Sequence, residues 1–294
     1  MIATDKKQKF SVQSILGSAG QQPVRMVILL LFSFITAPAM AEFNEKIQIS
    51  LGRSITTFDT DLAINTKDNS IDKNIDLEDD LNFDQQVQSS WFRASYRLSN
   101  RHRLRFTYTP IRRTAQAESQ KDLNIEDYII KAGATLDSKT RSEIYDVDYV
   151  YSFYKRPDLE LGMSGGIYWY ATNSEIVANG EIVLENNETQ VLQTYKTKQK
   201  FYAPLPLLGM TASYELNSQW KIHSAARYLY VSIANITGRI TSAAASADYY
   251  INDNWGIGFA LSAFTLDATR EGLVVDNGLR WSHSGAQFYI VYKK

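Results

Sequence analysis

Cysteine is missing from this sequence of 294 residues. Its absence excludes a scaffold held together by disulfides and a zinc site built from thiolates. An excess of charge of one sign is missing as well, because 31 Lys and Arg stand against 32 Asp and Glu. Such a chain has no general attraction for nucleic acid, so we expect no nucleic-acid partner. We also expect no cofactor and no metal site.

Long hydrophobic runs are nearly absent too. The exception is residues 26–41, MVILLLFSFITAPAMA, which follow several basic residues and end in Ala39-Met40-Ala41. This pattern predicts a cleaved secretory signal over residues 1–41 and a mature domain over residues 42–294. The alternative is an amino-terminal membrane anchor, but the run is short for a span of about 20 residues. A secreted chain without another such run would have to cross a membrane as a closed barrel.

Aromatic residues are abundant, with 18 Tyr, 13 Phe and 5 Trp. Residues 245–264 show how they are arranged: one strand, a polar turn at Asn252-Asp253-Asn254, and a second strand. The second strand has two different faces, since side chains alternate along a strand. A soluble sandwich usually buries its large residues, whereas a small inner face suits a narrow barrel in lipid. The large face holds Trp255, Ile257, Phe259, Leu261 and Ala263, and the small face holds Gly256, Gly258, Ala260 and Ser262.

The same hairpin recurs at residues 95–110, 148–165 and 213–228. Four tight turns join eight strands, and further strands near residues 47–58 and 280–292 make ten. Between the tight turns lie longer polar connections. Short turns at one end and long loops at the other predict an all-β fold. We expect a transmembrane antiparallel up-and-down barrel of about ten strands, with short periplasmic turns and long extracellular loops.

Charged residues fall on the faces opposite the large apolar ones. A charge facing lipid costs about 2–4 kcal/mol at the bilayer midplane, so we expect these groups to point inward. Inside, each would need a partner of opposite sign. A barrel of about ten strands is narrow, which favours a plugged lumen over a selective channel. The predicted lumen ion network comprises Arg93, Arg97, Arg105, Asp146, Asp148, Glu160, Glu215, Arg227 and Asp248.

Residues 59–84 form an acidic connection with nine Asp or Glu against two Lys. A calcium site or a receptor-facing patch is one interpretation, but the spacing matches no twelve-residue calcium loop. We favour a solvated outer loop, or a segment folded into the mouth to meet arginines. Residues 115–141 and 174–200 are expected to contain exposed hairpins. Residues 236–239 are expected to form a short link and residues 271–279 the last loop.

The chain resembles small bacterial outer-membrane β-barrel proteins. The resemblance is carried by the signal segment, the repeated hairpins, DLEDDLNFD at residues 76–84 and YRLSNRHRLRF at residues 96–106. It implies the outer membrane of a Gram-negative bacterium as the location. It also implies outer-membrane lipid, lipopolysaccharide and the barrel assembly machinery as partners. The chain departs from the pattern at its end, where Lys293 and Lys294 follow the last aromatic residue.

The function expected from the sequence is a structural or surface-interaction role, with an extracellular ligand that the residues do not identify. A narrow passive channel is the first alternative. An outer-membrane lipid-modifying enzyme or protease is the second, because omptin-type proteases are ten-stranded barrels too. His102 and His223 are predicted at the inner end, and only His283 at the outer end. Its serine neighbours would point to the opposite face, so we expect no catalytic site and no enzyme activity.

Overall fold

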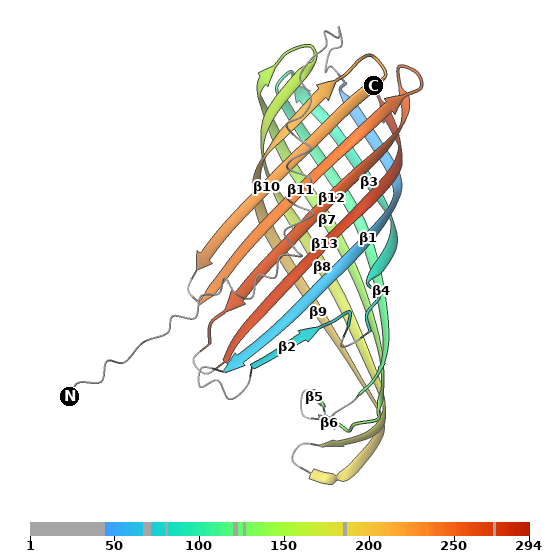
Figure 1. The fold of residues 1–294 in the computed structure, drawn as a ribbon, viewed down its shortest axis with the longest axis vertical. Coiled ribbons are helices and arrows are strands. Elements are labelled where there is room, and N and C mark those ends of the chain that lie inside the picture. The colour runs from blue at the N-terminus through green and yellow to red at the C-terminus, as the bar shows by residue number, and fades with distance from the viewer. Residues whose placement is uncertain are drawn as a thin grey trace, which may run out of the picture.

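The computed structural model describes residues 45–66, 72–79, 82–119, 123–125, 128–184, 187–233, 235–272 and 275–294. The predicted signal segment, residues 1–41, lies outside these ranges. Thirteen strands of the described part join one sheet, and ten of them close into a barrel (Figure 1). Every strand pairs antiparallel, and β1 pairs with β13 to complete the cylinder. The predicted ten-stranded all-β barrel is therefore confirmed.

The ten wall strands differ in length, and three short strands lie beyond the wall. The wall consists of β1 (Ile47–Thr66), β3 (Gln86–Ser99), β4 (His102–Glu118), β7 (Thr135–Lys155), β8 (Leu159–Leu184), β9 (Asn187–Glu215), β10 (Trp220–Ile233), β11 (Ile236–Tyr250), β12 (Trp255–Arg270) and β13 (Val275–Lys293). The short strands are β2 (Asp72–Asp76), which pairs with β1, β5 (Leu123–Ile125), and β6 (Tyr128–Ile130), which pairs with β8.

Four tight turns gather at one end of the barrel, which we call the turn end, together with the C-terminus (Figure 1). Asparagine fixes two of them. The Asn217 carboxamide oxygen accepts hydrogen bonds from the amides of Gln219 and Trp220, at 2.9 and 2.8 Å. Asn252 does the same in the last turn. Asparagine stabilises turns in this way, which is why the sequence located them correctly.

At the opposite end, the loop end, the predicted boundaries were wrong. Residues 236–239 begin β11 rather than forming a link, and β13 begins at Val275, inside the predicted last loop. β1 runs to Thr66, well into the predicted acidic connection. The exposed hairpin predicted over residues 174–200 is present as the continuation of β8 and β9, and residues 115–141 largely continue β4 and β7. About 9–11 residues cross a bilayer, so these strands extend far beyond it.

The extended strands carry a small core of their own. It consists of Ile130, Ala134, Leu136, Ala178, Ile182 and Tyr195, with Tyr128 packed against it. β8 bends near Gly180, where φ is 150° and a side chain would overlap Ala134. Figure 1 shows β5 and β6 beside the bent ends of β8 and β9. We call residues 128–140, 174–184 and 187–198 the loop-end extension.

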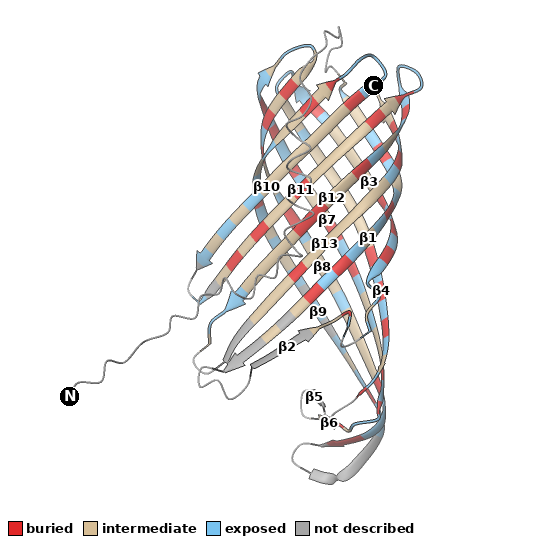
Figure 2. Ribbon diagram, in the orientation of Figure 1, coloured by how far each residue is buried: buried red, intermediate tan, exposed pale blue. Residues whose placement is uncertain are grey.

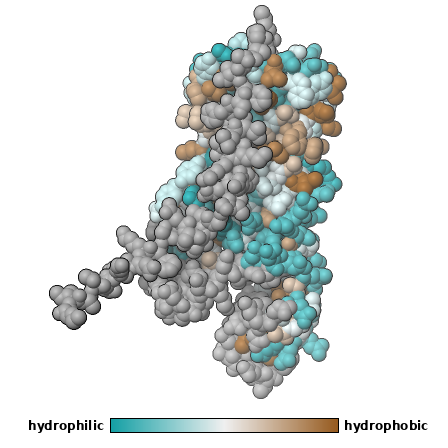
Figure 3. Space-filling view, viewed as in Figure 1, coloured by the Kyte–Doolittle hydropathy of each residue, from teal (hydrophilic) through white to brown (hydrophobic). Residues whose placement is uncertain are grey.

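Large apolar side chains cover the outside of the barrel near the turn end. Leu208 is 66% exposed and Ile290 57% exposed. Buried and exposed residues alternate along the strands in Figure 2, and apolar residues gather near the turn end in Figure 3. An outward apolar belt flanked by aromatic rings is the surface of a transmembrane barrel. Belt residues include Leu51, Leu104, Val147, Tyr149, Met163, Ile167, Trp169, Met210, Tyr228, Trp255, Ile257, Phe259 and Phe288.

In the part of the chain that the structure describes, no helix has the length and apolarity to cross a membrane.

Candidate functional site

The lumen near the turn end is filled by ion pairs. Arg97 donates two hydrogen bonds to the Glu160 carboxylate, at 3.0 and 2.9 Å. Arg103 reaches the same carboxylate at 3.2 Å, and the Ser152 hydroxyl also donates to it. Arg97 and Glu160 are each only 6% exposed as side chains. Such a bidentate pair satisfies both buried charges at once.

A second cluster at this end joins Lys221 to Glu45 and Glu215. Next to it, the Asp248 carboxylate accepts hydrogen bonds from the Tyr289 hydroxyl at 2.5 Å and from the Gln48 amide at 3.2 Å. The Tyr289 ring passes over Gly258, where any side chain would overlap it. The glycine on the small inner face therefore makes room for this buried network.

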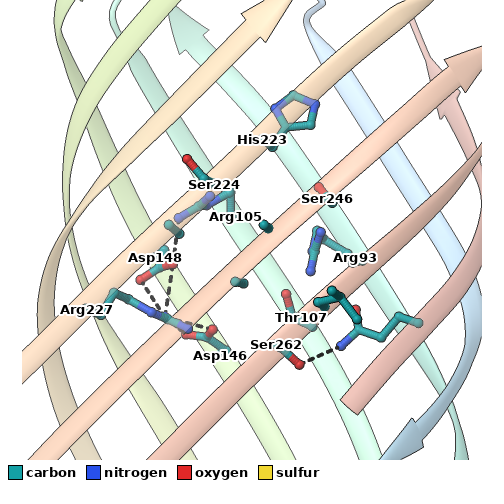
Figure 4. A pocket seen from close by; sticks show the side chains of 16 residues that line it. Arg93, Arg105, Thr107, Asp146, Asp148, His223, Ser224, Arg227, Ser246 and Ser262 are labelled. Atoms are coloured by element: carbon teal, nitrogen blue, oxygen red, sulfur yellow. Dashed lines mark hydrogen bonds and ion pairs between the residues drawn. The ribbon is translucent and has the colours of Figure 1, made fainter. Parts of the chain in front are cut away.

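Further into the barrel, two arginines meet two aspartates (Figure 4). Arg105 lies 2.9 Å from Asp148, and Arg227 lies 2.8 Å from Asp146 and 3.2 Å from Asp148. These groups line a cavity of about 100 Å³, which adjoins a second of about 60 Å³. The cavities are polar and small, with room for a few water molecules only.

The structure thus brings seven of the nine predicted lumen residues into ion pairs: Arg97, Arg105, Asp146, Asp148, Glu160, Glu215 and Arg227. Asp248 accepts hydrogen bonds from Tyr289 and Gln48 instead. Arg93 differs. It lines both cavities and its guanidinium lies over the Trp91 ring at 4.9 Å. Among the described residues it forms no ion pair. The pairings link Lys221 and Arg103 to the network, positions that were not among the nine.

Beyond the cavities, a layer of apolar side chains crosses the lumen, and all ten wall strands contribute to it. We call it the apolar septum. Its rings pack closely: Tyr168 stacks on Phe264 at 4.8 Å, and Phe264 lies 5.4 Å from Trp281. Among the described residues, each wall strand contributes at least one side chain to this apolar cluster. The members are Phe58, Val87, Ile111, Ile144, Tyr168, Leu207, Leu229, Ile240, Phe264 and Trp281.

The acidic connection covers the septum from the loop end. Glu78 is buried there, bonded to Arg113 and to the Thr60 amide at 2.8 Å. The Arg113 guanidinium lies over the rings of Phe58 and Phe83, at 4.8 and 5.2 Å. Of the alternatives weighed for this segment, the structure shows the one that folds into the mouth to meet an arginine. We call residues 76–79 and 82–84 the mouth segment.

Three carboxylates of the acidic connection, from Asp59, Asp61 and Asp76, approach within 4.8 Å. One Asp76 oxygen accepts hydrogen bonds from the amides of Glu78 and Asp79, at 2.9 and 2.8 Å. Asp76 therefore caps the turn that leads to Glu78. Acidic side chains of this kind often stabilise turns, and nothing further follows from the cluster.

Removing Arg113 is expected to release the mouth segment. Arg113→Leu would leave Glu78 buried without its cation, and the cost of about 3–5 kcal/mol is avoided if the segment leaves the mouth. Limited proteolysis after Glu78 by a glutamate-specific protease should therefore become much faster. Arg112→Leu, the outward neighbour on the same strand, is the matched control. Equal cleavage rates in the two variants would contradict the role of the Arg113–Glu78 pair.

The three histidines occupy different environments. The His283 ring stacks on Phe264 at 5.2 Å beside the septum, and neither ring nitrogen has a hydrogen-bond partner. His102 lies at the turn end against Tyr149 and Tyr151. His223 Nδ1 lies 2.9 Å from the Ser213 hydroxyl, and its Nε2 lies 3.4 Å from Asp248. Sequence reasoning missed Ser213 because it faces His223 only across the β9–β10 pairing.

No family model and no curated protein matches the chain. Solved structures with a similar shape are bacterial barrels. The outer-membrane protease OmpT of Escherichia coli is 11% identical, with 84% of this chain and 97% of that chain covered and a TM-score of 0.46. OprG of Pseudomonas aeruginosa is 10% identical, with 87% and 99% covered and a TM-score of 0.37. Ail of Yersinia pestis is 9% identical, with 83% and 98% covered and a TM-score of 0.24.

The chain has the fold of the small bacterial outer-membrane barrels. Three features of the chain identify this fold: the closed antiparallel wall, the tight turns at one end and the apolar belt. The identities and TM-scores of the solved structures carry no inference about its role.

Proposed function

We propose that this protein is a non-conducting barrel of the bacterial outer membrane that serves a structural and surface-interaction role. The apolar septum is the observation that carries the proposal, because it interrupts the lumen with a side chain from every wall strand. Water and ions need polar partners or open space, and a packed disc of rings and aliphatic chains provides neither. The mouth segment adds a second barrier on the loop side.

The loop-end extension supports the interaction part of the proposal. Strands that only crossed the bilayer could end far earlier. Here β7, β8 and β9 continue for 21, 26 and 29 residues and bury a separate apolar core. A binding surface on a rigid platform is already ordered before a ligand arrives. Binding then costs less conformational entropy than it would on a flexible loop. An extracellular ligand that approaches the membrane would reach this platform before it reached the rest of the barrel.

The geometry around the histidines supports a non-enzymatic role. Catalysis by serine and histidine needs the hydroxyl within hydrogen-bond reach of the imidazole. The Ser282 hydroxyl instead donates to the Asp59 carbonyl at 3.3 Å, and the His283 ring is enclosed by Phe58, Phe264 and Trp281. Ser213 is buried inside the lumen with His223, which keeps a lipid or peptide substrate away from it.

Planar-bilayer recording tests closure of the lumen. The purified, folded protein is expected to give a flat current trace at all applied voltages. Folding would be verified by the change in gel mobility that heat-denatured barrels show. Discrete conductance steps from the folded protein would contradict the proposal and favour the passive-channel alternative.

Surface binding is tested with whole cells. Cells displaying the complete chain are compared, on an array of immobilised glycans and matrix proteins, with cells displaying a variant whose β8–β9 extension is shortened between residues 176 and 197. These two residues face each other in the register, so the cut rejoins paired strands. Retention should depend on the extension. Identical retention by both cell types would count against a surface-interaction role.

A further inference from the structure

Positive charge gathers on the outside of the barrel, on three of four neighbouring strands. Arg112 on β4 faces Arg141 on β7 in the register, and the same row continues through Asn173 on β8 to Lys200 on β9. Lys139 lies two residues further along β7. All four cations are exposed. We call Arg112, Lys139, Arg141 and Lys200 the basic patch.

The central pair of this patch breaks a rule of sheet stability. Like charges placed directly opposite each other on adjacent strands repel and destabilise the sheet. Within the described part of the chain, none of the four cations forms an ion pair. A local conflict without an internal compensation is typical of a site that is completed by a ligand.

The nearby carboxylates do not compensate the patch. Glu175 is engaged by Lys196 and Lys198, at 2.7 and 3.1 Å. Hydrogen bonds from Lys196 and then Lys198 lower the pKa of the Glu175 carboxyl to about 2, so it stays ionised and its single charge is shared between those two lysines. Glu143 accepts hydrogen bonds from the hydroxyls of Tyr108 and Tyr145, at 3.1 and 3.0 Å.

The height of the basic patch above the apolar belt indicates which part of the membrane lies next to it. Tyr108, Tyr145 and Trp169 form one row across the same strands, and such rings mark the boundary between hydrocarbon and headgroups. Arg112 and Arg141 lie four residues beyond Tyr108 and Tyr145 towards the loop end. At about 3.3 Å per residue and a strand tilt of about 40°, this places them about 10 Å above the rings. That level belongs to lipid headgroups.

We infer that the basic patch binds the phosphate groups of an anionic lipid in the outer leaflet. Arginine holds phosphate through paired N–H donors, and two adjacent arginines can share one phosphate group. Lys139 and Lys200 flank the pair and can meet a second phosphate of the same headgroup. The acyl chains of this lipid would lie against the belt below. The inference rests on the proposed outer-membrane location and names the lipid contact of that location.

The test uses purified lipopolysaccharide, its chemically dephosphorylated form and inorganic phosphate. Bound lipid is counted by native mass spectrometry of the full chain in non-ionic detergent micelles. The variant Arg112→Gln/Arg141→Gln should weaken binding of intact lipopolysaccharide by about tenfold or more, because charge-assisted hydrogen bonds to phosphate are lost. Arg101→Gln/Arg270→Gln removes the same charge from exposed positions at a turn and on β12, and should bind as the unaltered chain does.

A second measurement separates binding from folding. Without lipid, the Arg112→Gln/Arg141→Gln variant should unfold at the same temperature as the unaltered chain or higher, because the repulsion between the arginines is gone. Intact lipopolysaccharide should raise the unfolding temperature of the unaltered chain only. Equal lipid binding by both double variants, undiminished binding of the dephosphorylated form, or full competition by inorganic phosphate would each overturn the inference. None of these results would alter the expected flat current trace, so the proposed closure of the lumen stands or falls separately.

Discussion

Replacing Phe58, Phe264 and Trp281 together by serine is expected to convert a silent barrel into a conducting one. These residues come from β1, β12 and β13, and their rings contact one another through Trp281. Serine removes the rings and introduces groups that hydrate, so water can join the polar cavities to the mouth. Phe58 also supports the Arg113 guanidinium, and its loss loosens the mouth segment. Planar-bilayer recordings should change from a flat trace to resolved openings.

A matched control distinguishes the septum from aromatic packing in general. Trp91 is equally buried but belongs to a separate cluster with Tyr250, Ala260, Tyr289 and Val291, on the cavity side of the septum. Trp91→Ser should enlarge the cavity and leave the trace flat. Removing a large buried ring costs about 3–5 kcal/mol, so only the folded fraction of each variant is recorded. A folded triple variant that stays silent would show that the septum is not the barrier.

The wall of this barrel could be predicted from the sequence because its signals are local. Alternation with period two can be recognised within a few residues. Asn217 and Asn252 mark their turns because each side-chain oxygen accepts hydrogen bonds from the backbone amides two and three residues ahead. On β4, Leu104 is exposed between Arg103 and Arg105, which both meet carboxylates in the lumen. The inward position predicted for Arg105 is therefore correct.

The septum escaped prediction because the pattern reverses along each strand. On β4, Arg105 faces the lumen where the outside meets lipid, but Ile111 faces it further on, where Arg112 is outside. Past the belt the outer surface meets water, so the strand returns to the usual arrangement of apolar groups inside. Sequence reasoning that assigns one lipid-facing side to a whole strand overlooks this change. On the outward face of β4, the residues change from the aromatic Tyr108 to the charged Arg112. This change in the sequence is the signal that could have revealed where the outer surface leaves the lipid.

The partners within the lumen could not be assigned either, since they depend on the stagger of the whole barrel. Arg97 and Glu160 are 63 residues apart, and Arg227 and Asp146 are 81 residues apart. β10 and β7 are not neighbours in the wall, so no local register brings Arg227 to Asp146. The sequence indicates which groups point inward, and only the closed cylinder decides which of them meet.

Arg227→Leu is expected to lower the free energy of unfolding by about 3–5 kcal/mol, the cost of stranding a buried charge. The charge concerned is Asp146, because Asp148 keeps Arg105 at 2.9 Å. The double variant Arg227→Leu/Asp146→Leu should recover most of the loss, since it removes both charges and fills the space with apolar groups. Urea unfolding in lipid vesicles, followed by tryptophan fluorescence, gives both values.

Two further substitutions sharpen the comparison. Arg105→Leu leaves Asp148 with Arg227 at 3.2 Å and should therefore cost less than Arg227→Leu. Arg101→Leu, at an exposed turn, should stay within about 0.5 kcal/mol of the unaltered chain. If Arg227→Leu and Arg101→Leu unfolded at the same urea concentration, the central arginines and aspartates would contribute nothing to holding the barrel together. If the double variant were no better than Arg227→Leu alone, the loss would come from packing of the arginine stem rather than from the stranded carboxylate.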